Sequence, residues 1–322
     1  MYRTLMVPLD GSAFGEHALP LALTIARRSG AAVHLAHVCV PPSPHDLVHL
    51  LHPDSDDLSM QARIRLYLDQ LATNLSERWE VPITTSVLVG PVVPTLREHA
   101  LALGADMVVL TTHGRGSLAR LAVGSVADAL VRSLPLPVLL TRPRDGVLDL
   151  LESAYERVCR RVLIPLDGSA LAEAVLEPAV AFGQLFDAEY TLLQAVDPPL
   201  LGYALTAHAT GIDQRALDVW REESLGYLEQ VAQRLRERQL QVKTDIALGY
   251  APQAILEYAH EHTFDLIALA THGRSGVARM LMGSTADAVV CRSSTPVLVI
   301  RPPAITERRE PAEHEMLERI PT

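Results

Sequence analysis

The sequence predicts an α/β protein made of two tandem, doubly wound domains, each with a five-stranded parallel sheet. The chain repeats itself, because Val7–Ala13 reads VPLDGSA and Ile164–Ala170 reads IPLDGSA, 157 residues later. Within each copy, short apolar segments alternate with helical segments of ten residues or more. This alternation is typical of βαβ units, which build a parallel sheet with helices on both faces.

Further matches in the same order extend the repeat over nearly the full length of both halves. THGR at Thr112–Arg115, Gly124-Ser125 and Pro137-Val138 recur 159 residues later as Thr271–Arg274, Gly283-Ser284 and Pro296-Val297. Each unit is long enough to bury its own core, unlike the roughly 20–50-residue units of a solenoid. We expect one domain over residues 1–143, a linker over 144–157, a second domain over 158–303 and a charged tail over 304–322.

In the first unit, apolar runs bounded by turn residues predict strands, and apolar residues at helical spacing predict helices. Strands are expected at Thr4–Leu9, Ala32–Val40, Ile83–Val89, Asp106–Thr111 and Pro137–Thr141. Helices are expected at Ala13–Ser29, Asp57–Trp79, Pro94–Leu103 and Ser125–Arg132, with Gly30 as the C-cap of the first. In such sheets ligands bind at the carboxyl ends of the strands, so the loops that follow the strands are the candidate sites.

Composition restricts the class of protein. The chain has 322 residues, 48% of them hydrophobic, and a formal net charge of -10, which disfavours nucleic acid as a partner. Its three cysteines are widely spaced, which predicts reduced, mostly buried thiols in a reducing compartment. No apolar stretch reaches the roughly 18 residues of a membrane span, and the N-terminus lacks the features of a signal peptide. We therefore expect a cytoplasmic protein that does not bind membranes.

The strongest site signal is the loop after the fourth strand of each unit. Thr111-Thr112-His113-Gly114 is followed by nine residues and then Gly124-Ser125 at a helix start, and Ala270-Thr271-His272-Gly273 leads in the same way to Gly283-Ser284. Free N–H groups, a hydroxyl and the positive end of the helix dipole form an anion site. Lys243 is the only lysine, so a phosphate would rely on backbone amides, on these serines and on Arg115, Arg120, Arg274 or Arg279.

One such loop alone is better explained as a turn and an N-cap. Its presence in both units, each with an aspartate after the first strand, favours a ligand. Asp10 and Asp167 could accept hydrogen bonds from a base or a ribose hydroxyl, or could cap the next helix, and one copy alone does not decide.

Together these segments resemble the universal stress protein family in its tandem, two-domain form. The resemblance rests on the order V/I-P-x-D-G-S, a long helix, a G-x-P or G-x-A-P turn, and (T/A)-T-H-G-x9-G-S, and it covers almost all of the chain except the linker and tail. It implies a Rossmann-like, adenine nucleotide alpha-hydrolase-like fold. Nucleotide-binding members carry G-x2-G-x9-G-(S/T), whereas this chain has Thr111 and Ala270 at the first glycine of that motif.

By similarity to the ATP-binding branch, the expected ligand is ATP, with magnesium. Asp10 and the backbone at Val38 would hold adenine, Gly90 would lie near the ribose, and Gly114, Gly124, Ser125 and Val126 would cradle the phosphates. The matching set in the second unit is Asp167, Ala195, Gly249, Gly273, Gly283, Ser284 and Thr285. If the first motif position needs a positive φ, alanine is costly there and threonine more so, so the second unit is predicted to be the better ATP site.

Other signals are weaker. His45, His49 and His52 have helical spacing and metal binding is conceivable, but a solvated loop explains them better because the second unit has no counterpart. His113 and His272 lie beside the phosphate loop and could be acid/base groups, but they are rather expected to orient the loop or to contact phosphate. No Walker A motif or catalytic triad appears, so no catalytic residue is assigned.

Three functions remain, in order of preference. The first is an ATP-binding sensor in a stress response, the second a ligand-free interaction module of the same fold, and the third a slow ATPase. The two units are expected to pack about a pseudo-two-fold axis through their last strands, Pro137–Thr141 and Pro296–Arg301, as a fused dimer. A homodimer of such chains stays open.

Overall fold

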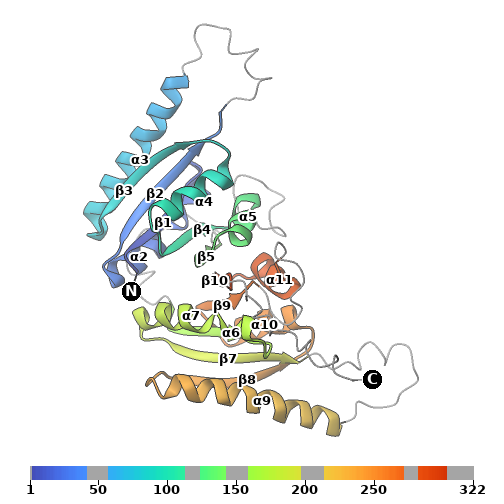
Figure 1. Cartoon of the computed structure of the whole chain (residues 1–322). Coiled ribbons are helices and arrows are strands. Elements are labelled where there is room, and N and C mark those ends of the chain that lie inside the picture. Colours follow the sequence, from blue (N-terminus) through green and yellow to red (C-terminus); the bar gives the residue numbers. More distant parts are fainter. Residues whose placement is uncertain are drawn as a thin grey trace, which may run out of the picture.

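The computed structural model describes residues 2–41, 57–112, 124–142, 159–196, 214–271 and 282–302. Strands alternate with helices throughout (Figure 1). The strands are β1 (Thr4–Pro8), β2 (Ala32–Cys39), β3 (Ile83–Val89), β4 (Met107–Thr111), β5 (Val138–Thr141), β6 (Arg161–Pro165), β7 (Glu189–Val196), β8 (Val242–Leu248), β9 (Leu266–Ala270) and β10 (Val297–Ile300). The helices are α1 (Ala13–Glu16), α2 (Leu19–Ser29), α3 (Asp57–Trp79), α4 (Val92–Ala102), α5 (Ser125–Ser133), α6 (Ala170–Glu173), α7 (Leu176–Gly183), the 3-10 helix η4 (Gln184–Phe186), α9 (Gln214–Arg236), α10 (Ala251–Glu261) and α11 (Ser284–Arg292).

The strands form one ten-stranded sheet in the order β3-β2-β1-β4-β5-β10-β9-β6-β7-β8. The pairs within each half are parallel, and the two halves meet where β5 and β10 pair antiparallel, with Val297 opposite Leu140 and Val299 opposite Val138. The prediction of two doubly wound, five-stranded parallel units is confirmed. The last strands of the units do meet, as expected.

Helices cover both faces of the sheet (Figure 1). One apolar core lies between the sheet and α2, α3, α7 and α9, and it contains Trp79, Phe182 and Tyr190. The other lies between the sheet and α4, α5, α10 and α11. Burial on both faces explains why the strands read as continuous apolar runs rather than as alternating patterns.

The helix expected over Ala13–Ser29 is two helices, which corrects the prediction. Ser12 caps α1, and α2 starts afresh with Pro20 in its first turn, where the missing N–H would have had no helical partner anyway. Gly30 is the C-cap, with φ 72, as predicted. The remaining boundaries in the first unit lie within two residues of those expected.

The three cysteines correct another expectation. None of them forms a disulfide, but only Cys159 is buried, whereas Cys39 and Cys291 are partly exposed. The linker (144–157), the tail (304–322) and the three loop histidines His45, His49 and His52 lie outside the described residues. Among the helices that the structure describes, none is both long and apolar enough to cross a membrane.

Candidate functional site

The loop after the first strand of each unit is built around an aspartate. Asp10 Oδ1 accepts hydrogen bonds from the Ser12 amide (2.9 Å) and hydroxyl (2.5 Å), and Ser12 Oγ in turn accepts one from the Gly15 amide. Asp167 and Ser169 make the same bonds, at 3.0 and 2.6 Å. The serine, not the aspartate, is therefore the N-cap of the next helix, which corrects one of the two interpretations of the aspartates. The carboxylate shapes the loop at the carboxyl edge of the sheet.

A tyrosine–glutamate pair lies near each aspartate, and the sequence analysis missed it. Tyr67 of α3 donates to Glu16 Oε1 at 2.5 Å, and Tyr227 of α9 donates to Glu173 Oε1 at 3.1 Å. Burial and the adjacent glutamate raise the pKa of both phenols, so they stay protonated donors. The detectable signal was the recurrence of Glu16 as Glu173 and of Tyr67 as Tyr227 in the two units.

The glycines expected near the ribose, Gly90 and Gly249, both have a positive φ, which favours glycine. Gly90 and Gly249 have φ of 149 and 125, and their amides donate to the last residues of β2 and β7, at 3.1 and 2.9 Å. At Gly90, an added Cβ would lie 2.5 Å from Thr95 Oγ1. Val38 pairs with Leu88 on β3, so the structure brings Val38 and Gly90 together at one edge, and Ala195 and Gly249 at the equivalent edge.

The candidate phosphate-binding helices begin directly beside the ends of β4 and β9. The Gly124 amide donates to the carbonyl of Thr112, and the Gly283 amide donates to that of Thr271. The N-cap residues of α5 and α11 are Gly124 and Gly283, which have no side chain to cap the first-turn amides. These amides belong to Ser125, Val126, Ser284 and Thr285 among others, and a helix N-terminus leaves them without intrahelical partners. Gly114, Gly273, His113, His272 and the four loop arginines lie outside the described residues.

Each unit also holds a buried polar atom without a hydrogen-bond partner at the same position. His37 Nδ1 on β2 and Gln194 Oε1 on β7 are both buried, and neither has a hydrogen-bond partner among the described residues. Each residue directly precedes the one expected at adenine, Val38 or Ala195. The His37 ring hydrogen-bonds the Leu9 backbone, and burial lowers its pKa, so the neutral ring presents Nδ1 as an acceptor. Orphaned buried polar atoms call for an explanation, and a donor group of a ligand supplies one.

The rim of the second unit carries an exposed aromatic side chain that the sequence analysis also missed. Tyr250 follows Gly249 and starts α10, is 57% exposed and makes no capping hydrogen bond. At the equivalent position the first unit has Pro91, which starts α4. The signal that could have found it is an aromatic residue beside an expected ribose-binding glycine.

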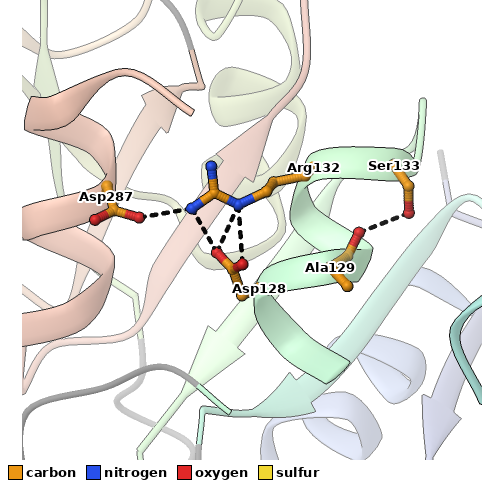
Figure 2. A network of polar contacts seen from close by, with 5 residues as sticks. All are labelled: Asp128, Ala129, Arg132, Ser133 and Asp287. Atoms are coloured by element: carbon orange, nitrogen blue, oxygen red, sulfur yellow. Dashed lines mark hydrogen bonds and ion pairs between the residues drawn. The ribbon is translucent and has the colours of Figure 1, made fainter. Parts of the chain in front are cut away.

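One arginine joins the two candidate phosphate-binding helices across the seam, which is the junction of the two units where β5 and β10 pair. Arg132 of α5 donates through Nε to both oxygens of Asp128 (2.8 and 2.9 Å) and through Nη2 to Oδ1 of Asp287 on α11 (2.9 Å). Figure 2 shows the guanidinium between the two carboxylates. Within the described parts of the chain, no group of three histidine, cysteine, aspartate or glutamate side chains could hold a metal ion.

Comparison with known proteins identifies related sequences for both halves. A model of the universal stress protein family matches residues 1–142 and 159–301. A universal stress protein of Mycobacterium tuberculosis is 29% identical over 305 residues, 92% of this chain and 96% of the relative. One from Methanocaldococcus jannaschii is 30% identical over 149 residues, 46% of this chain and 85% of the relative.

A solved structure shows the same fold along the chain. The crystal structure of a universal stress protein from Archaeoglobus fulgidus has a TM-score of 0.64 and 18% sequence identity. The match covers 92% of this chain and 98% of that one. At 18% sequence identity, this likeness shows the fold alone.

Proposed function

The chain belongs to the universal stress protein family, and on that premise we propose that it is a cytoplasmic stress-response sensor that binds ATP. The observation that carries this proposal is the duplicated edge. In each unit an aspartate loop, a left-handed glycine and an uncapped helix N-terminus meet at the carboxyl ends of parallel strands. This is where ligands bind in doubly wound sheets.

The residues present fit a nucleotide. The first-turn amides of α5 and α11 would receive the phosphates, because a helix N-terminus attracts anions. The orphaned acceptors, His37 Nδ1 and Gln194 Oε1, would receive a donor such as the amino group of adenine. Magnesium would accompany the ATP phosphates and offset their charge. The argument from a positive φ at the first motif position fails, because Thr111 ends β4, Ala270 ends β9 and neither has a positive φ. The second unit remains the proposed stronger site on another observation, the exposed Tyr250 at the position where the first unit has Pro91.

The domain boundaries follow the same proposal. We place one nucleotide-binding domain over residues 1–143 and the other over 158–303, joined by the linker and followed by the tail. The antiparallel pairing of β5 with β10 supports a fused pseudo-dimer of these two domains.

The matched substitutions Ser125→Asp and Ser284→Asp test the phosphate sites. An acidic residue in the first turn stabilises a helix, so the fold should survive, while the added charge repels a bound phosphate. We expect Ser284→Asp to weaken binding of Mg-ATP by about tenfold and Ser125→Asp to remove only the weaker site. Isothermal titration calorimetry of nucleotide-free protein measures both, with circular dichroism as the check on folding.

The outcomes separate the three candidate functions. Absence of ATP binding to the wild-type chain would contradict the proposal and favour an interaction module. ATP turnover that is lost in a folded Asp167→Asn chain would favour a slow ATPase. If the two serine variants lost equal affinity for Mg-ATP, or if Ser125→Asp lost more, the ranking of the second unit as the stronger site would be rejected.

Tyr250 is expected to contribute to the second site by stacking on the base. Aromatic–base stacking is worth about 1–3 kcal/mol, so Tyr250→Ala should weaken ATP binding about tenfold, while Tyr250→Phe should bind as the wild type does. Pro91→Ala in the first unit is the matched control. If the phenylalanine variant loses as much affinity as the alanine variant, the contribution comes from the hydroxyl and not from stacking.

A further inference from the structure

Arg132 holds two acidic side chains that belong to different candidate sites. Asp128 lies in the first turn of α5 and Asp287 in the first turn of α11, the helices whose N-termini begin at Gly124 and Gly283. The guanidinium of Arg132 pairs with Asp128 on its own helix and with Asp287 of the other unit, as Figure 2 shows. The charges near the two proposed phosphate sites therefore meet in one network.

Among the residues that the structure describes, this network has no symmetric counterpart. The repeat places Cys291 of α11 where α5 has Arg132, although Asp287 is retained where α5 has Asp128. Nε and Nη2 of Arg142, after β5, are buried and have no hydrogen-bond partner among the described residues, so neither atom bonds Asp287. Two carboxylates thus share one arginine, and the cluster of three side chains carries a net charge of -1.

We propose that Arg132 is a positioning residue that makes both phosphate sites compatible with an anion, by partly offsetting the charge of an aspartate beside each. This inference rests on the proposed binding of a nucleotide. An aspartate in the first turn of a helix opposes a phosphate that would bind at the same N-terminus, because both are drawn to the same partial positive charge. Pairing with a guanidinium, which stays charged at all physiological pH values, offsets that opposition.

The shared arginine predicts an effect that crosses the seam. Arg132 belongs to the first unit. Its loss leaves Asp287 of the second unit without the ion pair that the structure shows. Affinity for an anionic ligand should therefore fall at both sites, and not only in the unit that carries the substitution. Because the side chains of Arg132 and Asp287 are partly exposed, the effect should shrink as salt screens the charges.

The test compares a charged and an uncharged ligand on the whole chain. Mg-ATP and adenosine are titrated by calorimetry into the wild type, Arg132→Leu and the triple variant Arg132→Leu/Asp128→Asn/Asp287→Asn. Arg132→Leu should bind Mg-ATP about three- to fivefold more weakly at both sites and adenosine as the wild type does. The triple variant, which removes the unpaired carboxylates, should recover the affinity for Mg-ATP.

The matched control is Arg292→Ala. Arg292 is an exposed residue in the last turn of α11, so this variant removes the same unit of charge from the chain without breaking the ion pairs of Arg132 with Asp128 and Asp287. It should bind Mg-ATP as the wild type does.

Three results would overturn the inference. Unchanged binding of Mg-ATP by Arg132→Leu would show that the network does not act on the sites. An equal loss for adenosine, or no recovery in the triple variant, would show that Arg132 acts through packing rather than charge. A wild-type chain that binds neither ligand would remove the proposed function itself, and this inference with it.

Discussion

Gly183→Ala is expected to destabilise the second unit by about 2–3 kcal/mol. Gly183 ends α7 against the ring of Tyr190, and an added Cβ would lie 2.7 Å from Cε1 and 2.8 Å from Cζ of that ring. Tyr190 is fully buried and its hydroxyl donates to the Val180 carbonyl at 3.0 Å, so the ring cannot swing aside. Overpacking a rigid core costs roughly 1–3 kcal/mol, and this site has little room to relax. Equilibrium urea unfolding, followed by circular dichroism, measures the loss.

Gly226→Ala is the matched control for this prediction. Gly226 lies inside α9, and nothing stands within 4 Å of the position its Cβ would take. The same substitution there should stabilise the protein by about 0.5–1 kcal/mol, because alanine favours the helix. If both variants were stabilised, the contact between Gly183 and Tyr190 would not be as tight as the structure has it.

Acid is expected to weaken the first unit through a buried histidine pair. The Nε2 atoms of His34 on β2 and His99 on α4 lie 2.9 Å apart, and His34 Nδ1 lies 2.8 Å from Thr84 Oγ1. Burial, together with the neighbouring His99, lowers the pKa of His34 to about 4, and burial lowers that of His99. Two imidazoles that face each other in this way cannot both be protonated without separating.

The sign of the pH effect follows from the lowered pKa. Between pH 6.5 and about 4, His34 is protonated in the unfolded chain but neutral in the folded chain. The contribution to stability is thus complete above pH 6.5 and is lost as the pH falls toward 4. One pKa unit corresponds to about 1.36 kcal/mol, so the loss should reach about 2–3 kcal/mol.

Urea unfolding at pH 7.5 and pH 4.5 measures this difference. His34 lies under α4, and His34→Leu should lose less unfolding free energy between pH 7.5 and pH 4.5 than the wild type does. His260→Gln, at an exposed position of α10, is the control and should lose as much unfolding free energy in acid as the wild type does. The second unit has Thr191 and Tyr258 at the equivalent positions, so the acid-sensitive part should be the first unit. If the wild type and His34→Leu lost the same unfolding free energy in acid, the pair of His34 and His99 would not be the source of the acid sensitivity.

The local elements of the fold were predictable because the physical signals are local. Apolar runs such as Ile83–Val89 and the helical spacing over Asp57–Trp79 specify their own strand and helix. The break between α1 and α2 was missed because apolar spacing continues through Pro20, whose effect depends on where the helix starts. Of the candidate site, the aspartate loops after β1 and β6 were predictable, whereas the pairing of Tyr67 with Glu16 required the packing of α3 against α1.

By itself, the sequence determined the duplication, the two doubly wound, five-stranded units and the aspartate loops that follow the first strand of each unit. These features follow from hydrophobic periodicity and turn residues, which act over short distances along the chain. Only the tertiary structure decided that Ser12 rather than Asp10 caps α1, that His37 and Gln194 bury equivalent unpaired atoms, and that Arg132 joins Asp128 to Asp287. Those contacts depend on side-chain geometry and, for Arg132 and Asp287, on elements 155 residues apart, which no local pattern encodes.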